Sequence, residues 1–278
     1  MTNTGPLTYN VALGYFDGVH IGHRAVINAV PDTAVFTFRN RNVNNITTDE
    51  TKRKLFTELG VKQICAYDFD AIKDMSPGQF VHDILHNELN AEVICCGYDF
   101  RFGAGGQANA EDLTRICGQY GIKTIIIPAV KAGGEPVSST RIRELIASGG
   151  IEAANRLLGY EMHYELEVVG GNKLGRTIGF PTINQNMPPE LILPRFGVYT
   201  GRVAVHGGCY KGITNIGVKP TAGENKQVTI ETHITGFDGD LYGEIIKVSL
   251  ISFIRPEMKF NSFTELSQQI KEDLKWLK

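Results

Sequence analysis

The chain has 278 residues, enough for two modest domains, and its hydrophobic fraction of 42% and charged fraction of 21% are ordinary for a globular protein. Its formal net charge of −2 gives no electrostatic reason to expect a nucleic acid as the main partner. No apolar run approaches membrane-spanning length, the N-terminus lacks the layout of a signal peptide, and the five cysteines form no C-x-x-C pair. We therefore expect a cytoplasmic protein with reduced thiols and no membrane partner.

The first part of the chain alternates strand patterns with helix patterns. Short runs rich in β-branched and apolar residues predict strands at residues 11–13, 34–38, 62–67, 92–97 and 123–127. Between them, Ser76, Pro77 and Gln79 have the spacing of a helix capping box with proline at the first helical position. This alternation predicts a doubly wound α/β fold, in which ligands bind at the carboxyl ends of the parallel strands.

The second part of the chain follows a different period. Helices are predicted at residues 139–146 and 151–158, and Gly159 supplies a stop signal for the second helix. After Gly159 the apolar residues alternate with polar ones, which predicts strands at residues 164–169, 199–205, 228–234 and 245–251. We expect these strands to form a small antiparallel barrel or sandwich.

A terminal helix and a domain boundary complete the predicted organisation. A capping box at residues 262–265 starts the helix, in which we expect Trp276 to pack. We place the boundary near Gly159, which gives domains 1–159 and 160–278. The fold class is therefore α/β plus β, with a doubly wound parallel sheet followed by a small antiparallel β-barrel that ends in a helix.

The first candidate site combines two motifs of the N-terminal domain. Residues 14–23 read G-Y-F-D-G-V-H-I-G-H at a strand-to-helix junction, where backbone N–H groups and the helix dipole favour an anion. His20 and His23 add two side-chain donors, although a glycine-rich turn with incidental histidines is the simpler interpretation. Residues 138–143, S-S-T-R-I-R, open a later helix with hydroxyls and arginines. Together the two motifs predict a site for nucleotide phosphates.

The second candidate site begins with a glycine-rich basic loop. Residues 170–184 contain Lys173 and Arg176 but lack the Walker pattern, so the loop alone is a weak indication of phosphate binding. At its end, Thr182 and Asn184 place oxygen ligands on one side of an extended segment, which suits a hard cation.

A glutamate on a later predicted strand is a candidate base. Val228, Ile230 and Ile234 share one face of that strand, so Glu231 points to the other face. An isolated glutamate in such a place is usually a solvated surface residue.

The motifs of the first half resemble the adenylyltransferase half of the bacterial bifunctional riboflavin kinase/FAD synthetase family. They are G-x-F-D-G-V-H-x-G-H, then G-x-D-F-x-F-G at residues 97–103, then S-S-T-x-I-R. The resemblance implies a Rossmann-like nucleotidyltransferase domain in which the FMN phosphate attacks the α-phosphorus of ATP. It implies that His20 and His23 bind the ATP phosphates and stabilise the transition state. The further residues that it implies are Gly14, Phe16, Asp17, Ser139, Thr140 and Arg143 for the nucleotide, and Asp99 and Phe100 for the flavin.

The motifs of the second half resemble the flavokinase half of the same family. They are G-R-x-x-G-F-P-T-x-N, G-V-Y, N-I-G-x-K-P-T, E-x-H-I, D-L-Y-G and I-R-x-E-x-K-F, in family order. The resemblance implies that Glu231 is the catalytic base for the riboflavin 5′-hydroxyl and that Arg255 lies near the flavin. It implies that Thr182 and Asn184 hold the Mg²⁺ of MgATP. The residues that it places at the nucleotide are Lys173, Gly175 and Arg176.

The resemblance therefore implies an enzyme that phosphorylates riboflavin to FMN and adenylylates FMN to FAD with release of diphosphate. Mg²⁺ is the implied cofactor, ATP the co-substrate and FMN the intermediate, and all partners are small molecules. Two loops depart from the family: residues 38–42 lack the proline and histidine of its F-x-P-H-P motif, and its glycine-rich tail is altered at residues 106–108, G-Q-A, where an arginine or a later glycine is common. One alternative is thus an active riboflavin kinase with a degenerate nucleotide-binding or regulatory N-terminal domain.

Two histidine patterns allow further interpretations. The His-x-Gly-His motif also occurs in class I aminoacyl-tRNA synthetases, but the near-neutral charge and the absence of a basic stripe disfavour an RNA-directed protein. His82 and His86 have a spacing that a metal site could use. Because no third ligand accompanies them, we interpret the pair as a solvent-exposed helix face.

Overall fold

The computed structural model describes residues 9–39, 44–171, 174–219 and 227–277. It divides into two compact units, Met1–Ser139 and Thr140–Lys278, whereas the boundary predicted from sequence lies near Gly159. Within the described ranges, no helix combines the length and the apolar character needed to cross a bilayer.

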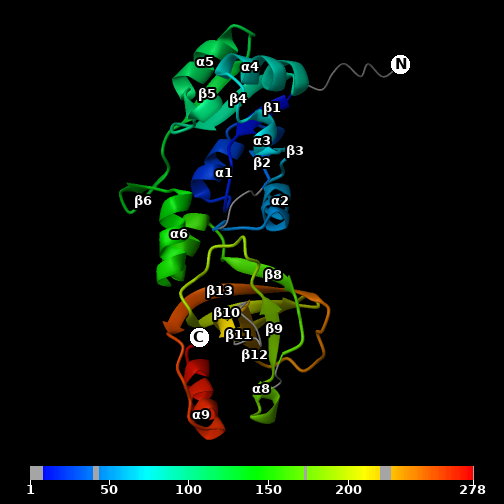
Figure 1. Ribbon diagram of the computed structural model, residues 1–278, viewed down its shortest axis with the longest axis vertical. Coiled ribbons are helices and arrows are strands. Elements are labelled where there is room, and N and C mark those ends of the chain that lie inside the picture. Colours follow the sequence, from blue (N-terminus) through cyan, green and yellow to red (C-terminus); the bar gives the residue numbers. More distant parts are fainter. Residues whose placement is uncertain (1–8, 40–43, 172–173, 220–226, 278) are drawn as a thin grey trace, which may run out of the picture. The chain divides into compact units, whose positions relative to one another are not determined.

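The first unit is built on a parallel five-stranded sheet with the order β3-β2-β1-β4-β5 (Figure 1). The strands are β1 (Tyr9–Leu13), β2 (Thr33–Phe38), β3 (Gln63–Tyr67), β4 (Ala91–Gly97) and β5 (Lys123–Ile127). Because β1 pairs with both β2 and β4, the connections diverge between β1 and β4, which makes the carboxyl ends of these two strands the topological switch point. This confirms the predicted doubly wound sheet and places two predicted motifs, residues 14–23 and 97–103, at that switch point.

Helices connect these strands. They are α1 (Ile21–Ile27), α2 (Asp49–Glu58), α3 (Phe69–Ile72), α4 (Pro77–Gln79), η1 (Phe80–Glu88), η2 (Ala104–Gly106) and α5 (Ala110–Gly118). The capping box predicted at Ser76 is present, since its hydroxyl accepts from the backbone N–H of Gln79 at 3.2 Å and the Gln79 side chain accepts in return at 3.0 Å. After this cap the helix continues as the π-helix η1, and a small hairpin, β6 (Lys131–Ala132) and β7 (Glu135–Pro136), follows β5 along the chain.

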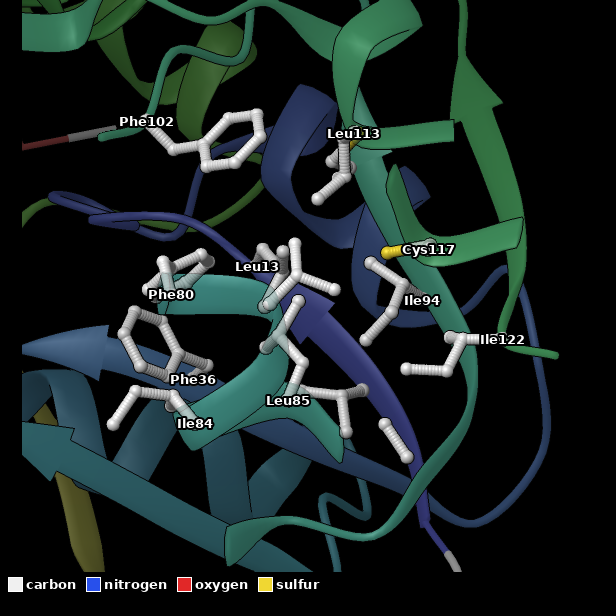
Figure 2. Packing of buried hydrophobic residues seen from close by; sticks show 14 of the residues in the cluster. Leu13, Phe36, Phe80, Ile84, Leu85, Ile94, Phe102, Leu113, Cys117 and Ile122 are labelled. Atoms are coloured by element: carbon white, nitrogen blue, oxygen red, sulfur yellow. The ribbon is translucent and has the colours of Figure 1, made fainter. Parts of the chain in front are cut away.

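One hydrophobic core of the first unit lies between the sheet and the helices η1 and α5. Figure 2 shows Leu13 and Phe36 of the sheet beside Phe80 and Leu85 of η1, all of them buried. The rings of Phe36 and Phe80 meet edge-on with centroids 5.4 Å apart, and Phe102 packs on Phe80 at 5.6 Å. Since Phe102 belongs to the loop after β4, the core itself anchors one of the two motif loops at the switch point.

The second unit carries two helices and an antiparallel six-stranded sheet with the order β8-β13-β10-β11-β12-β9. The helices are α6 (Ser139–Ser148), whose first residue still belongs to the first unit, and α7 (Ile151–Leu158), which ends at Gly159 with a φ of 78° as predicted. The strands are β8 (His163–Glu167), β9 (Thr182–Asn186), β10 (Gly197–Val205), β11 (Gly208–Lys219), β12 (Gln227–Ile234) and β13 (Ile245–Arg255). A short helix α8 (Leu174–Thr177) precedes β9, and α9 (Phe263–Leu274), red in Figure 1, follows β13.

The six strands form a nearly closed barrel, as predicted. Beyond β8, the backbone N–H of Val169 donates to the carbonyl of Asn184 at 2.8 Å. The fully buried Gln185 completes the contact, because its Nε2 donates to the carbonyls of Leu166 at 2.7 Å and Ile246 at 2.8 Å. The prediction for Trp276 is wrong: this side chain lies just after α9 and is 58% exposed.

Candidate active sites

The first candidate site is the junction between β1 and α1. His20 caps α1, and its Nδ1 accepts a hydrogen bond from the backbone N–H of His23 at 3.2 Å. The two imidazole rings are stacked with centroids 3.5 Å apart. Because Nδ1 of His20 is the acceptor, we assign the proton of the neutral ring to Nε2, which is then a donor. The structure thus brings the two predicted phosphate-binding histidines together at the start of the seven-residue helix α1.

Two glycines make room for this arrangement. A Cβ atom on Gly22 would lie 3.1 Å from Cε1 of His20, and one on Gly14 would lie 2.8 Å from the ring of Phe16. Phe16 is buried with a positive φ of 55°, a strained conformation that persists only where packing fixes it. Its ring meets His23 edge-on with centroids 5.2 Å apart. Gly14 and Phe16 therefore support His23, and their predicted direct contact with the nucleotide stays a prediction.

Asp17 connects the two predicted phosphate motifs. It is 1% exposed, and its carboxylate accepts hydrogen bonds from the backbone N–H groups of Ile46, at 2.9 and 3.1 Å, and of Thr47, at 3.3 Å. Its backbone carbonyl accepts a hydrogen bond from the hydroxyl of Ser139 at 3.0 Å. Asp17 thus fixes the segment after β2 and the start of α6, while its predicted contact with the nucleotide stays a prediction.

The other predicted residues of the first phosphate site are not tested by these contacts. Thr140 is exposed and Arg143 is half-buried, and both lie on α6 in the second unit. The loop that departs from the family pattern falls partly on residues 40–43, which lie outside the described residues. The roles of Thr140 and Arg143 toward a triphosphate stay predictions.

A buried lysine that the sequence reasoning missed lies beside the first site. Lys52 of α2 is 3% exposed, and its Nζ donates to the carbonyl of Phe38 at 2.8 Å. The same Nζ lies 4.9 Å from the ring centroid of Tyr15 and 3.3 Å from a carboxylate oxygen of Asp49. Burial lowers the pKa of Lys52, and the charge of Asp49 opposes this shift. The helical period could have predicted that Lys52 is buried, since it lies three residues before the buried Leu55 and therefore on the same helix face.

The loop after β4 carries the two residues predicted to lie near the flavin. Asp99 is exposed, and Phe100 is half-buried with its ring stacked on Phe102 at a centroid distance of 5.8 Å. Because β4 pairs with β1, this loop and the loop of His20 after β1 follow neighbouring strands at the same edge of the sheet. That placement suits a second ligand beside the nucleotide, and flavin contact stays a prediction.

The second candidate site lies on one face of the antiparallel sheet. Glu231 of β12 is the register partner of Asn184 on β9 and of Asn215 on β11. Glu231 lies on the strand face opposite the buried Ile230 and Ile234, as predicted. Directly opposed residues of an antiparallel pair have Cβ atoms about 4.5–5.5 Å apart. The predicted base and one predicted cation ligand are therefore immediate neighbours.

A histidine that the sequence reasoning did not single out positions the other cation ligand. His233 is the register partner of Thr182, and its Nδ1 hydrogen-bonds the carbonyl of Pro181 at 2.8 Å. Because a carbonyl oxygen only accepts, we assign the proton of His233 to Nδ1. The ring of Phe180 packs edge-on against His233 with centroids 5.4 Å apart. His233 thus fixes Pro181, the residue before Thr182. The sequence signal that could have identified His233 is its position two residues after Glu231, on the same face of the strand.

The glycine loop packs directly on the predicted cation ligands. A Cβ atom on Gly171 would lie 2.5 Å from Nδ2 of Asn184. A Cβ atom on Gly175 would lie 2.2 Å from the carbonyl oxygen of Phe180 and 3.6 Å from the hydroxyl of Thr182. Only glycine allows this approach, as expected for a loop that receives a ligand close to its backbone.

The basic side chains of this loop stay predictions for nucleotide binding. Arg176 is exposed, and Lys173 lies outside the described residues. Arg255, predicted near the flavin, forms a bidentate ion pair with the buried Asp273 of α9, at 2.9 Å from Nε and 2.7 Å from Nη2. Gln269 donates to the same carboxylate at 3.0 Å. The guanidinium of Arg255 therefore holds α9 against the end of β13, and contact with a flavin stays a prediction.

The donor set at Asn184 and Thr182 fits a magnesium ion. Magnesium prefers oxygen ligands and usually takes only one or two from the protein, the rest being phosphates and water. The side-chain amide of Asn184 and the hydroxyl of Thr182 supply such oxygens on one strand. Among the described residues there is no group of three His, Cys, Asp or Glu side chains that could hold a metal, and the predicted helix face at His82 and His86 lies on η1. Both of these histidines are exposed, as expected.

Comparisons with known proteins match the two halves of the chain to two family models. The FAD synthetase family model matches residues 5–141 and the riboflavin kinase family model matches residues 158–278. Bifunctional riboflavin kinase/FMN adenylyltransferases of Listeria monocytogenes and Bacillus subtilis are 34% and 33% identical, each aligned with 95% of this chain and 89% of the relative. The corresponding protein of Escherichia coli K12 is 32% identical over 95% of this chain and 90% of its own length. A crystal structure described as a macrolide-efflux protein from Streptococcus pneumoniae superimposes with a TM-score of 0.88 at 28% identity, covering 98% of this chain and 95% of that chain.

A doubly wound parallel sheet with paired histidines, followed by a barrel with a glycine loop beside a glutamate, fits a two-domain phosphoryl and nucleotidyl transferase. Both family models match, in this order, and the relatives align along nearly the whole chain. The chain belongs to the family of bifunctional riboflavin kinase/FMN adenylyltransferases. It is a transferase with both activities, which favours the bifunctional interpretation over a kinase with a degenerate N-terminal domain.

Proposed function

We propose that the two reactions occur at two separate sites, one at the carboxyl ends of the parallel strands and one on the barrel. The barrel would transfer the γ-phosphoryl group of ATP to riboflavin, and the doubly wound unit would transfer AMP from a second ATP to the FMN. The observation that carries this proposal is the separation of the two constellations, with His20 and His23 after β1 and the pair of Asn184 and Glu231 on the barrel. ATP is then the co-substrate of both reactions, and FMN is the intermediate that links them.

In the kinase reaction, Glu231 takes the proton from the 5′-hydroxyl of riboflavin. The oxygen of that hydroxyl attacks the γ-phosphorus of ATP, and ADP leaves. A carboxylate is a sufficient base, because phosphoryl transfer depends more on orientation and charge stabilisation than on a strong nucleophile. Thr182 and Asn184 would hold Mg²⁺, which when bound neutralises charge on the ATP phosphates. The close packing of Gly171 on Asn184 supports this placement.

In the adenylylation reaction, an oxygen of the FMN phosphate attacks the α-phosphorus of ATP and the bond to diphosphate breaks. No protein nucleophile is needed, so the residues orient the two phosphates and stabilise the developing negative charge. Nε2 of His20 and the ring of His23 are the donors that we assign to this task. Ser139, Thr140 and Arg143 would hold the triphosphate, and Asp99 and Phe100 would lie at the flavin.

Product analysis tests the proposal. Purified protein given riboflavin, ATP and Mg²⁺ is expected to accumulate FMN first and FAD afterwards, and omission of Mg²⁺ should stop both products. FMN alone, even with excess ATP, would mean that the first unit does not adenylylate.

We further propose that the enzyme works in the cytoplasm on these small molecules and has no nucleic-acid or membrane partner. The ordinary composition and the net charge of −2 support this proposal. Tight, salt-sensitive binding of tRNA would contradict it.

A further inference from the structure

A second carboxylate, that of Glu257, lies over β11, the strand that pairs with the strand of Glu231. A Cβ atom built on Gly217 of β11 would lie 1.9 Å from Oε1 and 2.5 Å from Cδ of Glu257. The φ of Gly217 is not positive, so the backbone conformation alone does not require glycine there. The carboxylate of Glu257 occupies the space that a side chain at this position would take, so a larger residue there would displace the carboxylate. Nδ2 of Asn215 donates to Oε1 of Glu257 at 3.4 Å, which orients the carboxylate.

The strand order places Glu257 on a defined side of the candidate base. The strands follow one another as β11, β12 and β9, with Asn215, Glu231 and Asn184 directly opposed in one row. The glycine loop packs on Asn184 at the β9 end of this row, and Glu257 lies over β11 at the other end. Neighbouring strands are about 4.8 Å apart, so the row spans about 10 Å.

Phosphoryl transfer needs the donor and the acceptor on opposite sides of the transferred group, with the base beside the acceptor hydroxyl. This inference rests on the proposed kinase function, in which ATP lies against the glycine loop at the β9 end. The acceptor then extends past Glu231 toward β11. Next to its reactive 5′-hydroxyl, riboflavin carries the other hydroxyls of its ribityl chain. A carboxylate accepts hydrogen bonds from hydroxyls and donates none when ionised.

We propose that Glu257 is a specificity-determining residue that accepts hydrogen bonds from the ribityl hydroxyls of riboflavin, oriented by Asn215 and accommodated by Gly217. It selects an acceptor that carries a polyol chain, and thereby aligns the 5′-hydroxyl with Glu231.

The test is the kinase reaction of the full chain carrying Glu257→Gln, which keeps the shape of the side chain but removes its charge. A hydrogen bond to a charged group contributes enough that the KM for riboflavin should rise about 10- to 100-fold. The KM for ATP should stay the same. Lumiflavin, which has the flavin ring without the ribityl chain, is the probe: its inhibition constant against riboflavin should be equal in the wild type and in Glu257→Gln.

Two more variants separate the possible outcomes. Gly217→Ala should raise the KM for riboflavin as well, because its Cβ displaces the carboxylate, and the double variant should be no worse than the more affected single one. Glu272→Gln removes an exposed carboxylate on α9 and should change nothing. An unchanged KM for riboflavin in Glu257→Gln, or an equal loss of lumiflavin binding, overturns the inference while leaving the kinase function intact. A wild-type protein that forms no FMN overturns both.

Discussion

Asn184 and Glu231 are directly opposed across the β9–β12 pair, so that a neutral oxygen ligand and a carboxylate share one face of the barrel. This relationship gives Glu231 a partner that an isolated surface glutamate would lack. It also ties the glycine loop to the reacting group, because that loop packs on Asn184.

Replacement of Glu231 by alanine should remove riboflavin phosphorylation selectively. General-base catalysis contributes about 10²- to 10⁴-fold, and FMN formation should fall by that factor. Adenylylation of supplied FMN should continue, because the histidines assigned to it lie in the other unit. Separate assays of the two steps check this. Loss of both activities in a folded protein would refute the assignment of separate sites.

The His23→Ala variant should show the reverse pattern. Removal of one donor to a developing phosphate charge costs about 10²- to 10³-fold in kcat, so FAD formation from FMN should fall while FMN formation is unchanged. His82→Ala is the matched control, since His82 is an exposed histidine on η1 of the same unit. A wild-type rate of FAD formation in His23→Ala would exclude this histidine from the mechanism.

Two adjacent glycines offer a sharp test of the loop. A Cβ on Gly171 meets the side chain of Asn184 at 2.5 Å, whereas a Cβ on Gly170 meets no atom within 4 Å. Gly171→Ala should therefore raise the KM for ATP in the kinase reaction by at least about tenfold, equivalent to ~1.4 kcal/mol. Gly170→Ala should behave as the wild type. Equal effects of the two substitutions would show that the contact with Asn184 is unimportant.

The ion pair between Arg255 and Asp273 should stabilise the second unit. Asp273→Ala leaves the guanidinium without its partner, which costs about 3 kcal/mol for a mostly buried pair. Glu272→Ala breaks an exposed pair with Lys275 on the same helix and should cost less than about 1 kcal/mol. Urea unfolding followed by circular dichroism measures both. Similar losses for the two variants would mean that burial of Asp273 adds nothing.

Alkaline pH should destabilise the first unit. Burial raises the pKa of the thiols of Cys95 and Cys117 to about 11 and that of Cys96 to about 12, from a usual value of 9.0. Between these values the folded state binds more protons than the unfolded state, so the stability present below pH 9 is lost as the pH rises above it. The unfolding temperature should fall between about pH 9 and pH 11, and Cys95→Ala should make that fall shallower. A flat profile would contradict this expectation.

Local sequence signals were sufficient for most of the fold. The alternation of strands and helices predicted the parallel sheet, and Gly159 ended its helix as expected, because these features depend on neighbours along the chain. The prediction that Trp276 packs in the terminal helix was wrong, because the exposure of a residue just after an amphipathic helix depends on which other elements pack there.

The site was predictable only as far as its residue types. The motifs identified His20, His23 and Glu231, but the sequence could not show that the carboxylate of Asp17 binds backbone N–H groups after β2 or that Arg255 pairs with Asp273. Both are tertiary contacts between segments distant in the sequence. Lys52 was missed for the same reason, since its acceptor is a backbone carbonyl at the end of another element.

The side-chain amide of Gln185 bears on the tendency of the barrel to aggregate. Among the described strands, β8 and β9 are the edges of the sheet, and an edge strand is a template on which another chain can add and aggregate. Gln185 reduces this exposure at β8, because its side-chain amide donates hydrogen bonds to carbonyls of both β8 and β13. The residue next to the candidate cation ligand Asn184 thus also protects the edge strand β8 of the folded barrel against association with another chain.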